Sequence, residues 1–110
     1  MEQIEATRHS LSTIEDGTSF YLKGLKFVCI CKSFPEAYEV FDENGIEVAY
    51  VRLRRYQLTC ECFDEVIYDD SFDCYSGEFK SGRQRIKRLN KIADKILERL
   101  EDNNERKRND

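Results

Sequence analysis

The sequence predicts an α+β fold, in which a four- to five-stranded antiparallel β-meander is packed by one long C-terminal α-helix. Three observations predict it. Residues 37–63 alternate polar and apolar side chains across two tight turns, and residues 25–33 are rich in β-forming residues. Residues 81–101 repeat apolar side chains at helical spacing. One apolar helix stripe covers one apolar sheet face, so these patterns fit a two-layer domain.

The chain divides into three parts by composition. Residues 1–19 are polar and weakly periodic, so we expect an N-terminal arm that is weakly structured or forms a short helix. Residues 20–101 are expected to form a single α+β domain. Residues 102–110 are almost wholly charged or amide, which predicts a disordered tail. A chain of 110 residues suits one domain with one core.

The first core strand is expected at residues 25–33, and Pro35 ends it because proline has no backbone donor. The meander follows. Asn44-Gly45 lies between two alternating runs and predicts a two-residue hairpin turn, since both residues tolerate positive φ. A type I turn with Gly45 in a bulge is the alternative, and it would shift the register by one residue.

The two-residue turn places Tyr38 opposite Val51 and Val40 opposite Ala49. A second tight turn at residues 54–57 continues this register. One face of the meander is then expected in the core: Tyr38, Val40, Ala49, Val51, Leu53, Leu58, Cys60 and Cys62. The other face is expected to be largely wet: Glu39, Phe41, Val48, Tyr50, Arg52, Arg54, Thr59, Glu61 and Phe63.

The last third of the chain holds the clearest helix. Residues 66–68 indicate a short fifth strand, and residues 71–79 indicate an acidic loop with aromatic anchors. Ser81 and Gln84 stand three apart as a capping box, so the helix is expected to begin there. Its apolar stripe continues to about residue 101: Ile86, Leu89, Ile92, Ala93, Ile96, Leu97 and Leu100.

Charge is unevenly distributed along the chain. Residues 1–79 hold 16 acidic and 7 basic residues, whereas residues 80–110 hold 6 and 11. We therefore expect an acidic sheet that carries a basic helix. No apolar run is long enough to span a membrane, and the N-terminus lacks the basic-then-apolar order of a signal peptide. These observations favour a cytoplasmic protein.

Four of the five cysteines form two pairs at strand spacing, Cys29 with Cys31 and Cys60 with Cys62. An odd count favours reduced thiols over a disulfide framework. Thiolates from adjacent strands could ligate zinc. In the expected register, however, Cys60 and Cys62 point into the core, where free Cys behaves as a small apolar residue. We expect no metal and no cofactor.

The sequence offers no credible catalytic set. The only histidine, His9, lies in the N-terminal arm, so a nucleophile and base would need that arm folded back on a strand. Clustered carboxylates at residues 64–73 could bind a divalent cation or act as acid and base. A solvated acidic loop is the commoner arrangement. We expect a protein that is not an enzyme.

Two stretches, FPEAYEVF at residues 34–41 and VAYVRLR at residues 48–54, carry a resemblance. Together they resemble a family of small bacteriophage, prophage and mobile-element proteins of Gram-positive bacteria, with the pattern S-[YF]-P-E-x-Y-x-V-[FY], a turn, and G/A-Y-[VL]-R-L-R. The resemblance covers about residues 25–100. Two departures are Arg55-Tyr56-Gln57, where an aromatic-Gly turn is frequent, and the cysteine pairs. The resemblance implies no particular activity. The resemblance implies a context in which inhibitors of host defence, including anti-CRISPR proteins, and DNA-metabolism accessories are frequent.

The leading hypothesis is a protein-binding module that contacts a host protein through an acidic surface. Such a surface can compete for a basic nucleic-acid groove, as an inhibitor of a defence enzyme would. Its candidate residues are Asp64, Glu65, Asp69, Asp70 and Asp73.

The alternative hypothesis is a nucleic-acid-binding accessory. The helix is basic from its first turn, which opposes its dipole and calls for an anion. That anion is nucleic acid or the protein's own acidic loop. The candidate residues are Arg54, Arg55, Tyr56, Arg83, Arg85, Lys87 and Arg88. Arginines beside tyrosines suit phosphates and bases, but Glu39 and Glu61 are expected to flank Arg52 in a cross-strand charge ladder.

Overall fold

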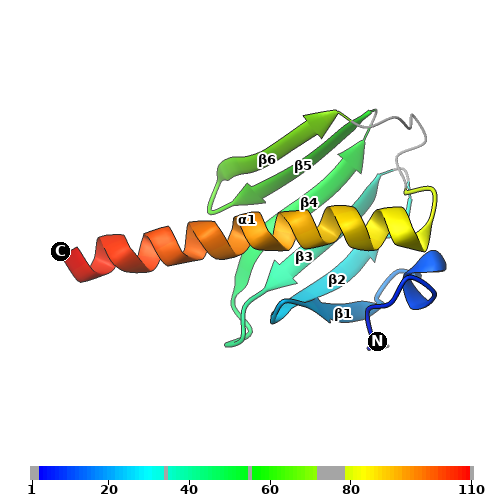
Figure 1. Cartoon of the computed structure of the whole chain (residues 1–110), viewed down its shortest axis with the longest axis horizontal. Helices are drawn as coiled ribbons and strands as arrows, with labels where there is room; N and C mark the ends of the chain where they lie inside the picture. Colours follow the sequence, from blue (N-terminus) through cyan, green and yellow to red (C-terminus); the bar gives the residue numbers. More distant parts are fainter. Residues whose placement is uncertain (1–2, 34, 55, 72–78, 110) are drawn as a thin grey trace.

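The structure is a computed structural model that describes residues 3–33, 35–54, 56–71 and 79–109, with side chains to residue 103. One antiparallel sheet has six strands in chain order: β1 (Ser19–Leu22), β2 (Leu25–Cys31), β3 (Glu36–Phe41), β4 (Glu47–Arg54), β5 (Gln57–Cys62) and β6 (Glu65–Ser71). A 3₁₀ turn, η1 (Ser10–Ser12), precedes it, and α1 (Gly82–Asn109) follows. Figure 1 shows α1 lying across one face of the sheet. The α+β class is confirmed, but the strands number six among the described residues, not four or five.

The extra strand is β1, and β6 is longer than expected. A tight turn at Lys23 and Gly24 connects β1 to β2, and both residues have positive φ, 53° and 84°. A strand of four residues carries too little alternation to stand out from the arm in sequence. In β6 the acidic residues expected in a loop, Asp69 and Asp70, pair with β5 and are part of the sheet.

The β3–β4 register is confirmed, but its turn is the alternative one. Gly45 has φ +78°, and its N–H donates to the carbonyl of Asp42 at 3.0 Å, as in a type I turn followed by a glycine bulge. The register should then shift by one residue. A second irregularity beside Val48 restores it before Ala49, and it also turns Val48, expected on the wet face, into the core, where it is 4% exposed.

The core lies between the sheet and α1. The sheet contributes a continuous apolar face, and every described side chain of the helix that is fully buried and apolar meets it. The sheet residues include Phe20, Phe27, Tyr38, Val40, Val51, Leu53 and Leu58, and the helix residues are Leu89, Ile92, Ala93 and Ile96. Burial of each large apolar side chain is worth roughly 1.5–3 kcal/mol, so this seam holds the two layers together.

The N-terminal arm packs on the domain instead of fraying. Leu11 and Ile14 join the core, and the Ile4 N–H donates to the carbonyl of Ser19 at 2.8 Å, beside the edge of β1. The arm meets the start of α1 closely, because a Cβ on Gly82 would lie 1.9 Å from the Arg8 carbonyl oxygen.

The helix begins as expected and ends later. The Ser81 hydroxyl accepts from the Gln84 N–H at 3.1 Å, and the Gln84 side chain accepts from the Lys80 N–H at 2.8 Å. The backbone stays helical to Asn109, past the expected end near residue 101, so the segment expected to be a disordered tail is helical to that residue. Glu, Lys and Arg are good helix formers, and Figure 1 shows the C-terminal end projecting beyond the sheet.

Candidate functional site

The face of the sheet turned away from α1 is covered by no described helix or strand, and we call it the open face. It carries exposed apolar side chains on both edge strands. Tyr21 on β1 is 47% exposed and Val66 on β6 is 54% exposed. Exposed aromatic and aliphatic side chains on a broad, uncovered sheet face are typical of an interaction surface.

One row of side chains crosses the open face from strand to strand. The register aligns Val28, Glu39, Tyr50, Glu61 and Val66 on β2 to β6. Tyr50 therefore lies between Glu39 and Glu61, whereas Arg52 pairs with Ala37 and Thr59. Glu39 and Glu61 are therefore diagonal neighbours of Arg52 and direct neighbours of Tyr50, and among the described residues neither forms an ion pair with Arg52.

A third carboxylate lies next to this row. Glu39 and Glu47 share a hydrogen bond, which raises the pKa of Glu39 above its usual value, with lesser contributions from burial and from the Glu47 charge. Two carboxylates close enough to share a proton mark a region of negative potential. A positive group from a partner would relieve that repulsion.

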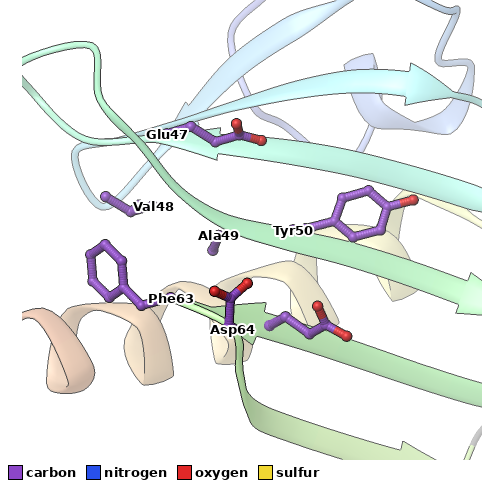
Figure 2. Close-up of a pocket in the computed structure, with 7 residues that line it drawn as sticks. Glu47, Val48, Ala49, Tyr50, Phe63 and Asp64 are labelled. Carbon is purple, nitrogen blue, oxygen red and sulfur yellow. The ribbon is translucent and has the colours of Figure 1, made fainter.

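The row is bordered by two hollows. Figure 2 shows the first, of about 250 Å³, where residues of β4 meet the β5–β6 turn. It is lined by Glu47, Val48, Ala49, Tyr50, Glu61, Phe63 and Asp64. The second, of about 450 Å³, is lined by Tyr21, Lys26, Val28, Glu39, Phe41, Asp42, Glu43 and Gly45. Both combine aromatic walls with carboxylates, which is the lining that suits a cationic side chain.

The turn that closes the first hollow is strained. Phe63 and Asp64 have φ of 51° and 65°, so a two-residue turn is made without glycine or asparagine. Left-handed backbone costs a residue such as Phe63 about 1–2 kcal/mol, whereas Asp adopts it more readily. The Phe63 ring is nevertheless 46% exposed. A strained backbone that keeps an apolar ring exposed to solvent is typical of a binding surface.

The acidic residues predicted from sequence are divided between the two faces of the sheet. Asp64 borders the first hollow, and Asp69 accepts from the Gln57 side chain at 3.1 Å on the open side of the sheet. Glu65 and Asp70 instead pair with arginines of α1, at 3.5 Å to Arg99 and 2.6 Å to Arg88. Asp73 lies outside the described residues.

Asp70 is one internal anion that the basic helix was expected to need. The Tyr68 hydroxyl and the Arg88 guanidinium both donate to it, and together they hold the pKa of Asp70 below its usual value. This part of the acidic set therefore fastens β6 to α1.

The basic residues predicted from sequence are also divided. Arg85 is 5% exposed and pairs with Glu36, which is fully buried, so Arg85 is not a surface residue. Arg88 is partly buried on Asp70. Arg54 is exposed at the end of β4, and Tyr56 is exposed in the turn that follows. Arg55 lies outside the described residues. On α1, Arg83 and Lys87 are exposed, and Lys91 extends their line.

Glu36 is the residue that sequence reasoning missed. Its carboxylate accepts from Arg85 Nε at 2.8 Å, from the Phe79 N–H at 2.9 Å and from the Tyr38 hydroxyl, while Arg85 also donates to the Leu11 carbonyl. Burial, and then the Glu36 charge, raises the pKa of Tyr38 well above its usual value. The signal was present, because Glu36 lies two residues before Tyr38 on the core side of a strand.

The cysteines do not converge. Cys29 and Cys60 stand at opposite ends of a row that runs through Tyr38 and Val51. They are three strand spacings apart, about 14 Å, so the four thiols cannot share one zinc ion. Burial raises the pKa of the Cys29 and Cys60 thiols to about 12. Within the described chain no group of three or more His, Cys, Asp or Glu residues could hold a metal ion.

No protein-family model matches the chain, and no curated protein or solved structure is significantly similar to it. Among the described residues, no helix has the length and apolar character that crossing a membrane requires.

Proposed function

We propose that this chain is a non-enzymatic protein-binding module that docks its open face on a basic surface of a partner protein. One observation carries the proposal. Four carboxylates on and beside the open face, one half-buried and three exposed, make no ion pair with any described residue, whereas those on the helix side, Glu65 and Asp70, are paired. The unpaired group is Glu39, Glu47, Glu61 and Asp64, which we call the acidic group.

Apolar surface beside the acidic group supports the same proposal. Tyr50 and Phe63 wall the first hollow, and Tyr21 and Phe41 wall the second. Aromatic residues and arginines supply most of the energy at protein interfaces. An interface formed here would pair exposed rings with aliphatic stems of the partner's lysines and arginines, and the acidic group with their charged ends.

The partner class follows from charge complementarity. A groove that binds nucleic acid is lined with lysine and arginine, and a rigid acidic sheet face occupies it in place of phosphate. Together with the resemblance to phage and mobile-element proteins, this favours an inhibitor of a host defence nuclease, such as an anti-CRISPR protein. On this proposal the chain blocks a site and performs no chemistry itself.

The test compares two variants with equal charge change. Glu47→Lys/Glu61→Lys neutralises the acidic group, because the two lysines offset its two remaining carboxylates, and Glu101→Lys/Asp102→Lys makes the same charge change at exposed helix positions. Tagged protein is used as bait in a nuclease-treated lysate of a Gram-positive host, and the captured protein is then assayed for nuclease activity. We expect the wild type and the helix variant to capture one protein stoichiometrically and inhibit it.

The open-face variant is expected to lose capture and inhibition together, by at least tenfold in affinity, which is about 1.4 kcal/mol. Equal capture by both variants would rule out the acidic group as the contact. A captured protein whose nuclease activity is unaffected would rule out the inhibitor role.

A further inference from the structure

The outer side of α1 carries a line of cations that the fold does not use. Arg83, Lys87 and Lys91 recur at intervals of four residues and are all exposed. None forms an ion pair with a described residue, whereas Lys95 pairs with Glu98 at 3.7 Å further along the same helix. We call these three residues the basic stripe.

The basic stripe works against the stability of its own helix. Its first member, Arg83, lies in the first turn of α1, where the helix dipole is positive and where no acidic residue is present. Like charges four residues apart also repel each other. A net charge of −4 shows that acidic residues are plentiful in the chain, yet none of those described pairs with the stripe. An external anion would remove both penalties.

The spacing of the stripe selects the kind of anion. Four residues of helix rise about 6 Å and rotate about 40° past a full turn, so the three cations span about 12 Å along the helix axis on a slowly turning line. Alternate phosphates of one strand are about 7 Å apart along a duplex axis, and a flexible single strand can adopt the same spacing. Lysine and arginine side chains readily match it. A single small anion would contact only one or two of the three.

We propose that the basic stripe binds the phosphate backbone of a nucleic-acid strand. The site lies on the opposite layer from the open face, because α1 covers the other side of the sheet (Figure 1). The acidic group repels nucleic acid from the open face, so a bound strand lies along α1. The inference goes beyond the proposed function and uses a separate surface. It also revises the set of basic candidates, since Arg85 and Arg88 are engaged internally.

The experiment measures binding of a fluorescein-labelled 20-nucleotide single strand by anisotropy between 50 and 200 mM salt, with roughly 0.7 counterions released per phosphate contact. For three contacts, the affinity of the wild type is expected to fall about 20-fold over this range. Arg83→Gln/Lys87→Gln/Lys91→Gln is expected to bind at least tenfold more weakly at 50 mM salt and to lose most of the salt dependence. Lys95→Gln, a paired cation on the same helix, is the matched control and should bind as the wild type does.

Three outcomes would overturn the proposal: no binding of the strand at 50 mM salt, equal affinity of the triple variant and the wild type, or equally tight binding of inorganic polyphosphate of the same charge. The triple variant removes only exposed like charges, so it should fold, and circular dichroism checks this. Glu47→Lys/Glu61→Lys separates the two proposals, because it should abolish protein capture without weakening nucleic-acid binding.

Discussion

A single buried ion pair joins four separate segments of the chain. Glu36 on β3 is fully buried, and its donors come from the same strand, from the segment before α1 and from α1 itself. Arg85 also connects the N-terminal arm to this group, because its guanidinium donates to the Leu11 carbonyl. The guanidinium also lies over the Phe79 ring, 5.7 Å from its centroid. Such a pair tolerates the loss of neither partner, because the survivor would be a buried, unpaired charge.

We expect Glu36→Gln to lower the free energy of unfolding by about 3–5 kcal/mol, because it leaves Arg85 charged and buried. Urea unfolding followed by circular dichroism measures it. Glu61→Gln, an exposed glutamate on β5, is the control and should change stability by less than about 0.5 kcal/mol.

The double variant Glu36→Gln/Arg85→Met distinguishes ion-pair loss from general disruption. Because it removes both charges, it should be more stable than Glu36→Gln alone. Arg85→Met is measured alone as well. If the losses from the two single substitutions simply add in the double variant, Arg85 is not the group that makes Glu36→Gln costly.

At the scale of elements, the position of α1 depends on a close backbone approach. The arm crosses the first residue of the helix, where Gly82 has no side chain to keep it away. Leu11 enters the core at the same place. The arm and the helix therefore form one packed unit, although residues 1–19 show little periodicity in sequence.

We expect Gly82→Ala to displace the arm. The added Cβ would lie 1.9 Å from the Arg8 carbonyl oxygen and 2.8 Å from the Ser12 nitrogen, and both are backbone atoms that cannot rotate away. Overpacking of this kind costs about 1–3 kcal/mol. Limited proteolysis should cut the arm faster than in the wild type.

Lys87→Ala, an exposed position one turn further along α1, should leave the cleavage rate of the arm unchanged. A cleavage rate for Gly82→Ala equal to that of the wild type would mean that the arm does not hold this position in solution.

At the scale of the whole molecule, charge is separated between two layers. The acidic group faces outward from the sheet, and the basic stripe faces outward from α1, with an uncharged row of Cys29, Tyr38, Val51 and Cys60 between them in the core. Three members of this row are weak acids, so the interior of the sheet responds to alkaline pH.

We expect stability to fall as the pH rises above about 9. The folded-state pKa of Cys29 and of Cys60 is raised from 9.0 to about 12, so the folded chain keeps protons that the unfolded chain releases. Their contribution is complete below pH 9 and is lost between about pH 9 and 12; Tyr38, with its raised pKa, acts in the same direction.

Urea midpoints at pH 7.5, 9 and 10.5 under reducing conditions measure this loss. In Cys29→Ala/Cys60→Ala the midpoint should depend less steeply on pH, although it will be lower throughout. A slope unchanged by the double substitution would assign the alkaline loss to other groups.

The local part of the fold could be predicted from the sequence. The register of β3 to β5 follows from alternation, and the helix start follows from Ser81 and Gln84, because both depend on residues close together in the chain. β1 was missed, because it is short and is defined by its pairing with β2. The turn at Gly45 was assigned to the wrong type, yet the register survived because a bulge beside Val48 compensates for it.

For the candidate site, the sequence predicted the kinds of residue present but not which of their charges are free. By itself the sequence determined the α+β class, the alternating strands, the apolar helix stripe and the separation of acidic from basic charge. Only the tertiary structure decided which charges are free. It buried Arg85 against Glu36 and paired Arg88 with Asp70, and it left the acidic group and the basic stripe without ion pairs among the described residues. The physical reason is that an ion pair depends on distance in space, and these partners lie 49 and 18 residues apart in the chain.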